Sequence, residues 1–273
     1  MRRRPPQTVF TKLLPPLFAA WLLIAPAALA QNLVQGRQVD LELILAVDCS
    51  YSVDQGEFEL QAGGIAQAFR TQEVVDAILQ GGHGAIAVTV LQWSSQLSQE
   101  VAVPWTLIDS RESAVALSLA IESMPRLTAD GATSISAAVA ASIRLFDLSP
   151  VRGLRRVIDV SGDGRNNNGP ALRAARDTAV GRGITINGLA ILNEVQTLHL
   201  YFEQQMIGGT GAFVEVANRY ADYPQAMARK LVKEIILLPV SKAPGGDDPG
   251  RRLAAVQPPV RSTPASAGAA FLR

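Results

Sequence analysis

Small oxygen-bearing side chains follow an apolar run in the stretch LILAVDCSYS, and two more segments of this kind, DGATSIS and SGDGRNNN, come later in the chain. Five of these side chains are candidate metal ligands: Asp48, Ser50, Ser52, Thr133 and Asp163. Hard oxygen ligands of low total charge suit Mg²⁺ or Mn²⁺, with Ca²⁺ a further candidate. Only two of the five carry a negative charge. A dication held by them would stay electrophilic and could accept a carboxylate from another molecule.

Strands and helices must bring these distant segments together, and the sequence alternates between apolar runs and longer amphipathic ones. The runs predict strands at residues 41–47, 85–93, 100–105, 155–163, 184–191 and 212–217. They predict helices at residues 57–70, 72–79, 110–123, 134–146, 170–182, 195–206 and 223–238. This order predicts an α/β fold: a Rossmann-like, doubly wound, mostly parallel six-stranded sheet with one short antiparallel edge strand and helices on both faces.

Ligands of such sheets bind at the carboxyl ends of the strands, near the point where the strand order reverses. Asp48 and Asp163 both end a predicted strand, and Thr133 directly precedes a predicted helix. We therefore expect the three segments to converge above one edge of the sheet.

The pattern D-x-S-x-S, then Thr, then Asp resembles the metal-ion-dependent adhesion site of von Willebrand factor type A domains, and the resemblance covers roughly residues 40–238. It implies that the two serines and the threonine bind the metal directly. The two acids would bind it directly or through water, and a protein partner's acidic side chain would complete the shell. The third segment departs from the family's usual Thr-Asp-Gly, because Gly162 precedes Asp163 and an asparagine run, residues 166–168, follows. This variant is similar to an uncharacterised bacterial secreted branch of the family, and it leaves open whether Asp163 binds directly or through water.

Simpler local roles compete with metal binding at these positions. Asp48 could cap a helix that begins near Val53, and Thr133 could cap the helix that follows it. Ser134 or Ser136 could supply the third hydroxyl instead of Thr133. The asparagine run could be an ordinary polar loop.

The two ends of the chain differ from its middle. Residues 1–30 begin with basic side chains, continue with an apolar stretch and close on Ala-Leu-Ala, which predicts a secretory signal peptide and no stable membrane span after cleavage. Residues 241–273 are rich in Pro, Ala, Gly and Ser and predict a disordered tail. One domain, residues 31–240, lies between them. We expect export, with the periplasm favoured over the cell exterior.

Charge and cysteine content narrow the choice of partners. Removing residues 1–30 takes away four basic and no acidic side chains, which changes the formal charge from +1 to −3. The tail from residue 241 holds five basic and two acidic residues, so residues 31–240 carry about −6. Nucleic acid is a poor partner for such a surface. The single cysteine, Cys49, excludes an internal disulfide, and we expect it to point inward as a small apolar side chain.

Three classes of function remain, and a metal-dependent protein- or ligand-binding module fits the motif best. A scaffold domain with a vestigial metal site is the second hypothesis. A Mg²⁺-dependent hydrolase is the third, but phosphatases of the D-x-D type need an acid where this chain has Ser50. The sequence also lacks a G-x-S-x-G elbow and a phosphate-binding loop with its lysine. We therefore predict that the protein is not an enzyme; the motif does not predict its oligomeric state.

Overall fold

The structure is a computed structural model that describes residues 35–236. The predicted signal peptide and the predicted tail lie outside the described residues. Within residues 35–236, none of the helices combines the length and the apolar character that crossing a membrane requires.

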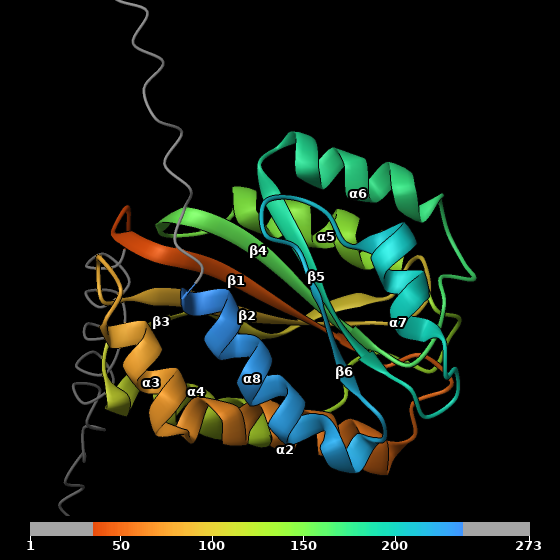
Figure 1. Cartoon of the computed structure of the whole chain (residues 1–273), viewed down its shortest axis with the longest axis horizontal. Helices are drawn as coiled ribbons and strands as arrows, with labels where there is room; N and C mark the ends of the chain where they lie inside the picture. Colours follow the sequence, from red (N-terminus) through yellow and green to blue (C-terminus); the bar gives the residue numbers. More distant parts are fainter. Residues whose placement is uncertain (1–34, 237–273) are drawn as a thin grey trace, which may run out of the picture. The chain divides into compact units, whose positions relative to one another are not determined.

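A single six-stranded sheet forms the centre of the described chain, with strand order β3-β2-β1-β4-β5-β6 (Figure 1). Its strands are β1 (Gln38–Asp48), β2 (Ile86–Trp93), β3 (Gln99–Ile108), β4 (Arg152–Gly162), β5 (Ile184–Ile191) and β6 (Val214–Ala217). All neighbouring strands are parallel except β2 and β3, which are antiparallel. The predicted fold class, including its antiparallel edge strand, is confirmed.

Helices cover both faces of this sheet. Along β1, Leu41, Leu43 and Leu45 pack into one apolar cluster, while Ile44 and Ala46 pack into the other. This alternation follows from the two-residue period of a strand that is buried on both faces. Figure 1 shows one helical layer below the sheet and one above it. The lower layer holds α2 (Gln55–Arg70), α3 (Gln72–Leu79), α4 (Arg111–Glu122) and α8 (Tyr223–Ile236). The upper layer holds α5 (Ile135–Asp147), α6 (Leu172–Gly181) and α7 (Leu198–Tyr201).

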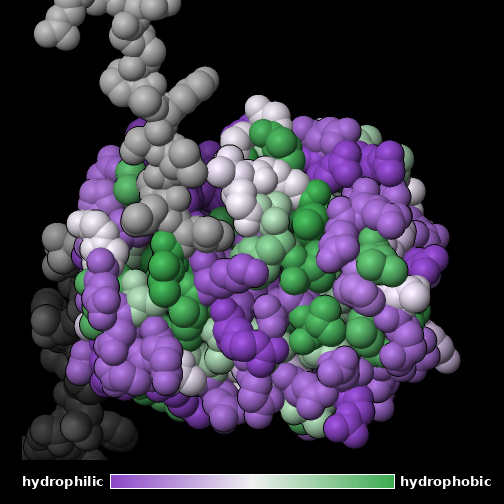
Figure 2. Space-filling view, in the orientation of Figure 1, coloured by the Kyte–Doolittle hydropathy of each residue, from purple (hydrophilic) through white to green (hydrophobic). Residues whose placement is uncertain are grey.

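Several elements differ from the sequence prediction: β1 and β4 each begin three residues earlier than predicted, and β4 ends at Gly162, one residue before Asp163. The edge strand β3 is longer than residues 100–105, because the pairing with β2 shifts register near Val90 and so accommodates Pro104. The predicted helix 195–206 is only one α-helical turn, α7, followed by a π-helical turn, η1 (Phe202–Met206). With these bounds Asp48 still ends β1 and Asp163 directly follows β4, so both acids stay at the carboxyl edge of the sheet. Most of the face seen in Figure 2 is hydrophilic, with apolar side chains in separate patches.

Candidate metal site

The central pair of strands brings the first and third motif segments together. Val47 of β1 pairs with Ser161 of β4, so the next residues, Asp48 and Gly162, lie side by side at the carboxyl edge. β1 has β2 on one side and β4 on the other, so the strand order reverses at this point of the sheet. Ligands of such sheets bind at the carboxyl ends of the strands at this position. The predicted convergence of these two segments is therefore present in the structure.

Asp48 is fully buried and has one oxygen without a partner. Its Oδ1 accepts a hydrogen bond from the backbone N–H of Ser50 at 2.7 Å, whereas Oδ2 has no donor among the described residues. Burial, followed by the charge of Asp163, raises the pKa of the Asp48 carboxyl from 3.8 to about 7. A buried carboxylate in this state gains strongly from a cation, because a charge in the interior is costly unless it is compensated.

Hydroxyl groups connect the two acids of the site. The hydroxyls of Ser50 and Ser52 lie 3.3 Å apart, and Ser52 donates to Asp163 Oδ1 at 2.6 Å. Ser50 and Asp163 are buried, while Ser52 is exposed, so the cluster opens to solvent on the Ser52 side. A hydroxyl that donates its proton to a carboxylate keeps its lone pairs for a metal.

Thr133 reaches the same place from the loop before α5. Its side chain lies against the residue after Asp163, where a Cβ on Gly164 would be 3.4 Å from Thr133 Oγ1. The backbones are joined as well, since the N–H of Asn167 donates to the Thr133 carbonyl at 2.9 Å. Thr133 thus lies beside the loop that follows Asp163, while Asp48, Ser50, Ser52 and Asp163 are linked through the hydrogen bonds described above and the pairing of β1 with β4.

The simpler local roles are taken by other residues. Asp54, not Asp48, caps α2, because its side chain accepts the N–H of Glu57 at 2.8 Å. The helix after Thr133 has no cap from its own N-cap residue, Ser134. The Ser134 hydroxyl donates instead to the carbonyl of Asn168 at 2.9 Å. Helix capping therefore occupies neither Asp48 nor Thr133, and the Ser134 hydroxyl is engaged elsewhere. The buried Ser136 hydroxyl has no partner among residues 35–236, so it stays an alternative to Thr133 as the third hydroxyl.

The asparagine run, residues 166–168, is held to other segments by hydrogen bonds from its side chains. The side-chain oxygens of Asn166, Asn167 and Asn168 accept backbone N–H groups at 2.9, 2.9 and 2.7 Å. The donors are Ser136, Thr133 and Gln96, in that order. The run therefore ties the Asp163 loop to the Thr133 loop and to the β2–β3 turn. The sequence showed its polarity, but the distant backbone donors could not be read from it.

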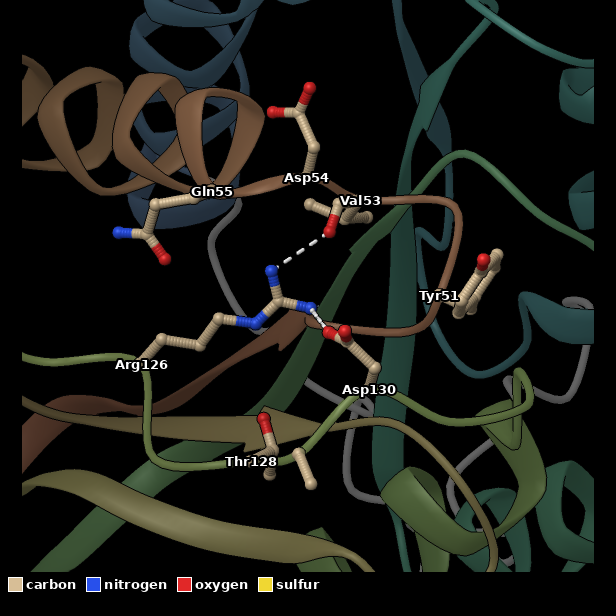
Figure 3. Close-up of a pocket in the computed structure, with 8 residues that line it drawn as sticks. Tyr51, Val53, Asp54, Gln55, Arg126, Thr128 and Asp130 are labelled. Atoms are coloured by element: carbon tan, nitrogen blue, oxygen red, sulfur yellow. Dashed lines mark hydrogen bonds and ion pairs between the residues drawn. The ribbon is translucent and has the colours of Figure 1, made fainter.

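Arg126 contacts the serine-bearing loop, and no motif in the sequence indicates this role (Figure 3). Its guanidinium donates to the carbonyls of Cys49 and Val53, both at 2.9 Å, and pairs with Asp130 at 2.6 Å. A groove of about 680 Å³ lies beside it, between Tyr51, Asp54 and Asp130.

Cys49 is buried, as expected, and burial raises the pKa of its thiol to about 11. The thiol therefore stays protonated and packs as an apolar group.

The donor set of the cluster fits a hard divalent cation. Among residues 35–236, no three His, Cys, Asp or Glu side chains gather in a way that could hold a metal. A metal here would depend on two carboxylates and three hydroxyls, the low-charge oxygen set that suits Mg²⁺ or Mn²⁺. The unpartnered Oδ2 of Asp48 is the atom that such an ion would satisfy.

Gly162, which departs from the family pattern, leads to a first prediction. A Cβ at this position would lie 2.7 Å from Asp48 Oδ2, so only glycine lets β4 approach that carboxylate. We expect Gly162→Ala to displace the Asp48 side chain and weaken Mn²⁺ binding at least about 10-fold, because ligands must be held within a fraction of an ångström. Titration calorimetry measures the change. Gly181→Ala is the control, since a Cβ there meets nothing within 4 Å. Equal affinity in Gly162→Ala and the wild type would contradict the prediction.

The described chain has the fold of von Willebrand factor A domains, as comparisons with solved structures show. Proximal thread matrix protein 1 from the mussel byssus matches with a TM-score of 0.55 and 16% identity over 73% of this chain. A von Willebrand factor type A protein from Catenulispora acidiphila matches with a TM-score of 0.51 and 20% identity over 72%. The pilus adhesin SpaC from Lactobacillus rhamnosus GG matches with a TM-score of 0.53 and 13% identity over 74%. The match spans 48%, 43% and 31% of those three chains, respectively, and at these identities it shows the fold alone.

Within this class, the chain belongs to the family described as "Protein of unknown function (DUF1194)", whose model matches residues 38–238. The match includes all five candidate ligand residues. A search of the curated proteins finds no match to the sequence.

Proposed function

We propose that this chain is an exported, divalent-cation-dependent binding module that recognises a carboxylate of a protein partner. Asp48, Ser50, Ser52, Thr133 and Asp163 hold Mg²⁺ or Mn²⁺, and the ion supplies an electrophilic position for the partner's acidic side chain. The predicted signal peptide supports export, with the periplasm as the expected location.

The proposal depends on one observation: the buried Asp48 side chain has an oxygen, Oδ2, without a hydrogen-bond partner among residues 35–236. A fully buried carboxylate with one unpartnered oxygen lies beside two serine hydroxyls and a second acid. Most buried polar atoms have a partner, so an orphaned carboxylate oxygen calls for an explanation. A bound cation explains the orphaned oxygen, the glycine beside it and the hydroxyl-rich surroundings together.

Two of the similar structures support the same direction. A further structure of proximal thread matrix protein 1, described as having a zinc-occupied MIDAS motif, matches this chain with a TM-score of 0.50 and 16% identity. SpaC is described as a pilus adhesin. Metal binding and adhesion are therefore compatible with this fold, and the contacts of Asp48 supply the argument for this particular chain.

The geometry gives less support to a hydrolase. A phosphatase of the D-x-D type needs a general acid two residues after its nucleophile, and this position is Ser50, whose hydroxyl lies against that of Ser52. We therefore propose a binding role without a catalytic step.

The test is calorimetric titration of residues 31–273, stripped of metal, with Mg²⁺ and with Mn²⁺. We expect one site in the wild type and none in Asp48→Ala. The control is Asp147→Ala, which removes an exposed carboxylate that pairs with Arg182. Circular dichroism checks that each variant is folded. A wild type that binds neither ion with or without a soluble carboxylate would overturn the proposal and favour a scaffold domain with a vestigial site.

The carboxylate position is tested on the loaded protein. Glutarate should bind in the presence of Mn²⁺ and not in its absence, because the ion supplies the charge that holds the carboxylate. Paramagnetic relaxation of glutarate protons by the bound Mn²⁺ measures this contact. Relaxation equal to that caused by the Asp48→Ala variant would show that no coordination position is open.

A further inference from the structure

Tyr220 contacts the candidate metal site from an element that the motif does not include. It begins the short 3₁₀ turn η2 (Tyr220–Asp222), which leads into α8. Its hydroxyl donates to Asp163 Oδ2 at 3.0 Å, and its side chain is only 4% exposed. The ring packs within the apolar cluster on the α2 and α8 side of the sheet. A buried, well-packed ring fixes the position of its hydroxyl.

Because of this contact, Asp163 and Asp48 differ in how many of their carboxylate oxygens accept a hydrogen bond. Both oxygens of Asp163 accept a hydroxyl proton, one from Ser52 at 2.6 Å and one from Tyr220 at 3.0 Å. Asp48, by contrast, keeps Oδ2 without a donor. Asp48 therefore has an oxygen with no other partner to offer an ion, whereas each oxygen of Asp163 already shares one of its lone pairs with a hydroxyl and is held in place by it.

We propose that Tyr220 is a positioning residue of the metal site, which holds Asp163 so that this acid acts through the Ser52 hydroxyl or a metal-bound water. The inference rests on the proposed function, since it concerns the same ion. A tyrosine suits this role because its hydroxyl is neutral and donates without adding charge. Burial, followed by the charge of Asp163, raises the pKa of Tyr220 and keeps the hydroxyl protonated. Partners of this kind orient metal ligands and tune the electron density that they offer.

Removing the hydroxyl alone tests the inference. Tyr220→Phe keeps the ring in the apolar cluster and frees Asp163 Oδ2. We expect Mg²⁺ and Mn²⁺ to bind about 10- to 100-fold more weakly, as is common when such partners of a metal ligand are lost. Tyr223→Phe is the matched control: it lies three residues further on, is equally buried, and its hydroxyl has no hydrogen-bond partner among residues 35–236. Its affinity should stay within about twofold of the wild type.

A spectroscopic measurement separates positioning from general structural support. Metal binding redistributes charge on Asp163, so the hydrogen bond from Tyr220 should change and give a tyrosine ultraviolet difference spectrum when Mg²⁺ is added. The signal should persist in Tyr223→Phe and vanish in Tyr220→Phe. If the substitution only loosened the fold, the difference spectrum would be weaker or broader, but it would not disappear in Tyr220→Phe alone.

Each outcome has a distinct meaning. If the wild type binds ions and Tyr220→Phe binds them equally well, the inference is wrong while the proposed function stands. If the wild type binds no ion under any condition, both fail. If Tyr220→Phe does not fold, the wild type and Tyr223→Phe still decide, because the absence of a metal-induced tyrosine signal in both would overturn the positioning role.

Discussion

The Asp48→Asn variant should lose divalent-cation binding and, at pH 8, be more stable than the metal-free wild type. Asparagine keeps the acceptor for the Ser50 N–H but carries no charge into the buried site. The difference between the ordinary pKa of 3.8 and the raised value of about 7 corresponds to at most about 4 kcal/mol of unfavourable free energy when Asp48 is ionised. We therefore expect the free energy of unfolding to rise by about 2–4 kcal/mol, measured by urea denaturation with a chelator present.

The pH dependence of this effect has a definite sign. The pKa of Asp48 is raised in the folded state, so the unfolded chain loses its proton first as the pH increases. The metal-free wild type should therefore lose stability between about pH 4 and pH 7, whereas Asp48→Asn should not show this loss. At pH 4 the two proteins should agree to within about 1 kcal/mol, because the native Asp48 is then neutral.

Bound metal should reverse the order at pH 8. An ion compensates the charge of Asp48, so saturating Mg²⁺ should stabilise the wild type and leave Asp48→Asn unchanged. Asp147→Asn, with its exposed carboxylate, is the control and should respond to metal as the wild type does. If Asp48→Asn is less stable than the metal-free wild type at pH 8, the buried charge of Asp48 does not destabilise the folded protein and the prediction is wrong.

The meeting of two candidate ligand residues at one edge of the sheet was predictable, because Asp48 ends one strand and Asp163 directly follows another. Asp48 follows an apolar run, Asp163 follows another, and parallel strands place both carboxyl ends at one edge. Thr133 required more, namely the order of segments seen in a known family. The contacts of the Asp163 loop to the Thr133 loop run through asparagine side chains to backbone N–H groups, and no periodicity in the sequence announces such bonds.

Tyr220 could not be found from the sequence. It lies 57 residues beyond Asp163, in a short turn, where an aromatic residue ordinarily indicates a core position. It is in fact a core residue, and only its hydroxyl reaches the site. The longer β3 strand and the π-helical turn at Phe202–Met206 were missed for a related reason: local propensity is weak at an edge strand and in short apolar runs, where tertiary packing decides.

A buried charge cluster beneath α8 should produce the largest stability effect outside the metal site. Lys230 of α8 lies 2.7 Å from Asp159 Oδ1 of β4 and also bonds Glu234 one turn further along the helix. All three side chains are at most 1% exposed. Asn187 of β5 donates to Glu234 at 2.8 Å and completes the cluster. One ammonium therefore serves two carboxylates in the apolar interior.

Lys230→Met should destabilise the protein by about 3–5 kcal/mol, because it leaves both carboxylates buried without their cation. Methionine fills a similar volume, so lost packing contributes little. For a domain of this size, the melting temperature should fall by roughly 10 °C. The control is Lys233→Met on the exposed side of the same helix, where the ammonium lies 4.0 Å from the centre of the Phe213 ring. It should cost about 1 kcal/mol or less.

The pH dependence of Lys230→Met then shows whether the lost charge, and not the lost side chain, is responsible. Burial already raises the pKa of Asp159, and it raises that of Glu234 to about 7 even with Lys230 present. A carboxyl group whose pKa is raised in the folded state makes the protein less stable as the pH rises. The stability difference between Lys230→Met and the wild type should therefore grow between pH 5 and pH 8. Adding Asp159→Asn and Glu234→Gln should flatten that slope and recover part of the stability, since neutral amides have no charge to compensate. A deficit that stays constant with pH would assign the effect to packing and would show that the ammonium is not what holds the two carboxylates in the core.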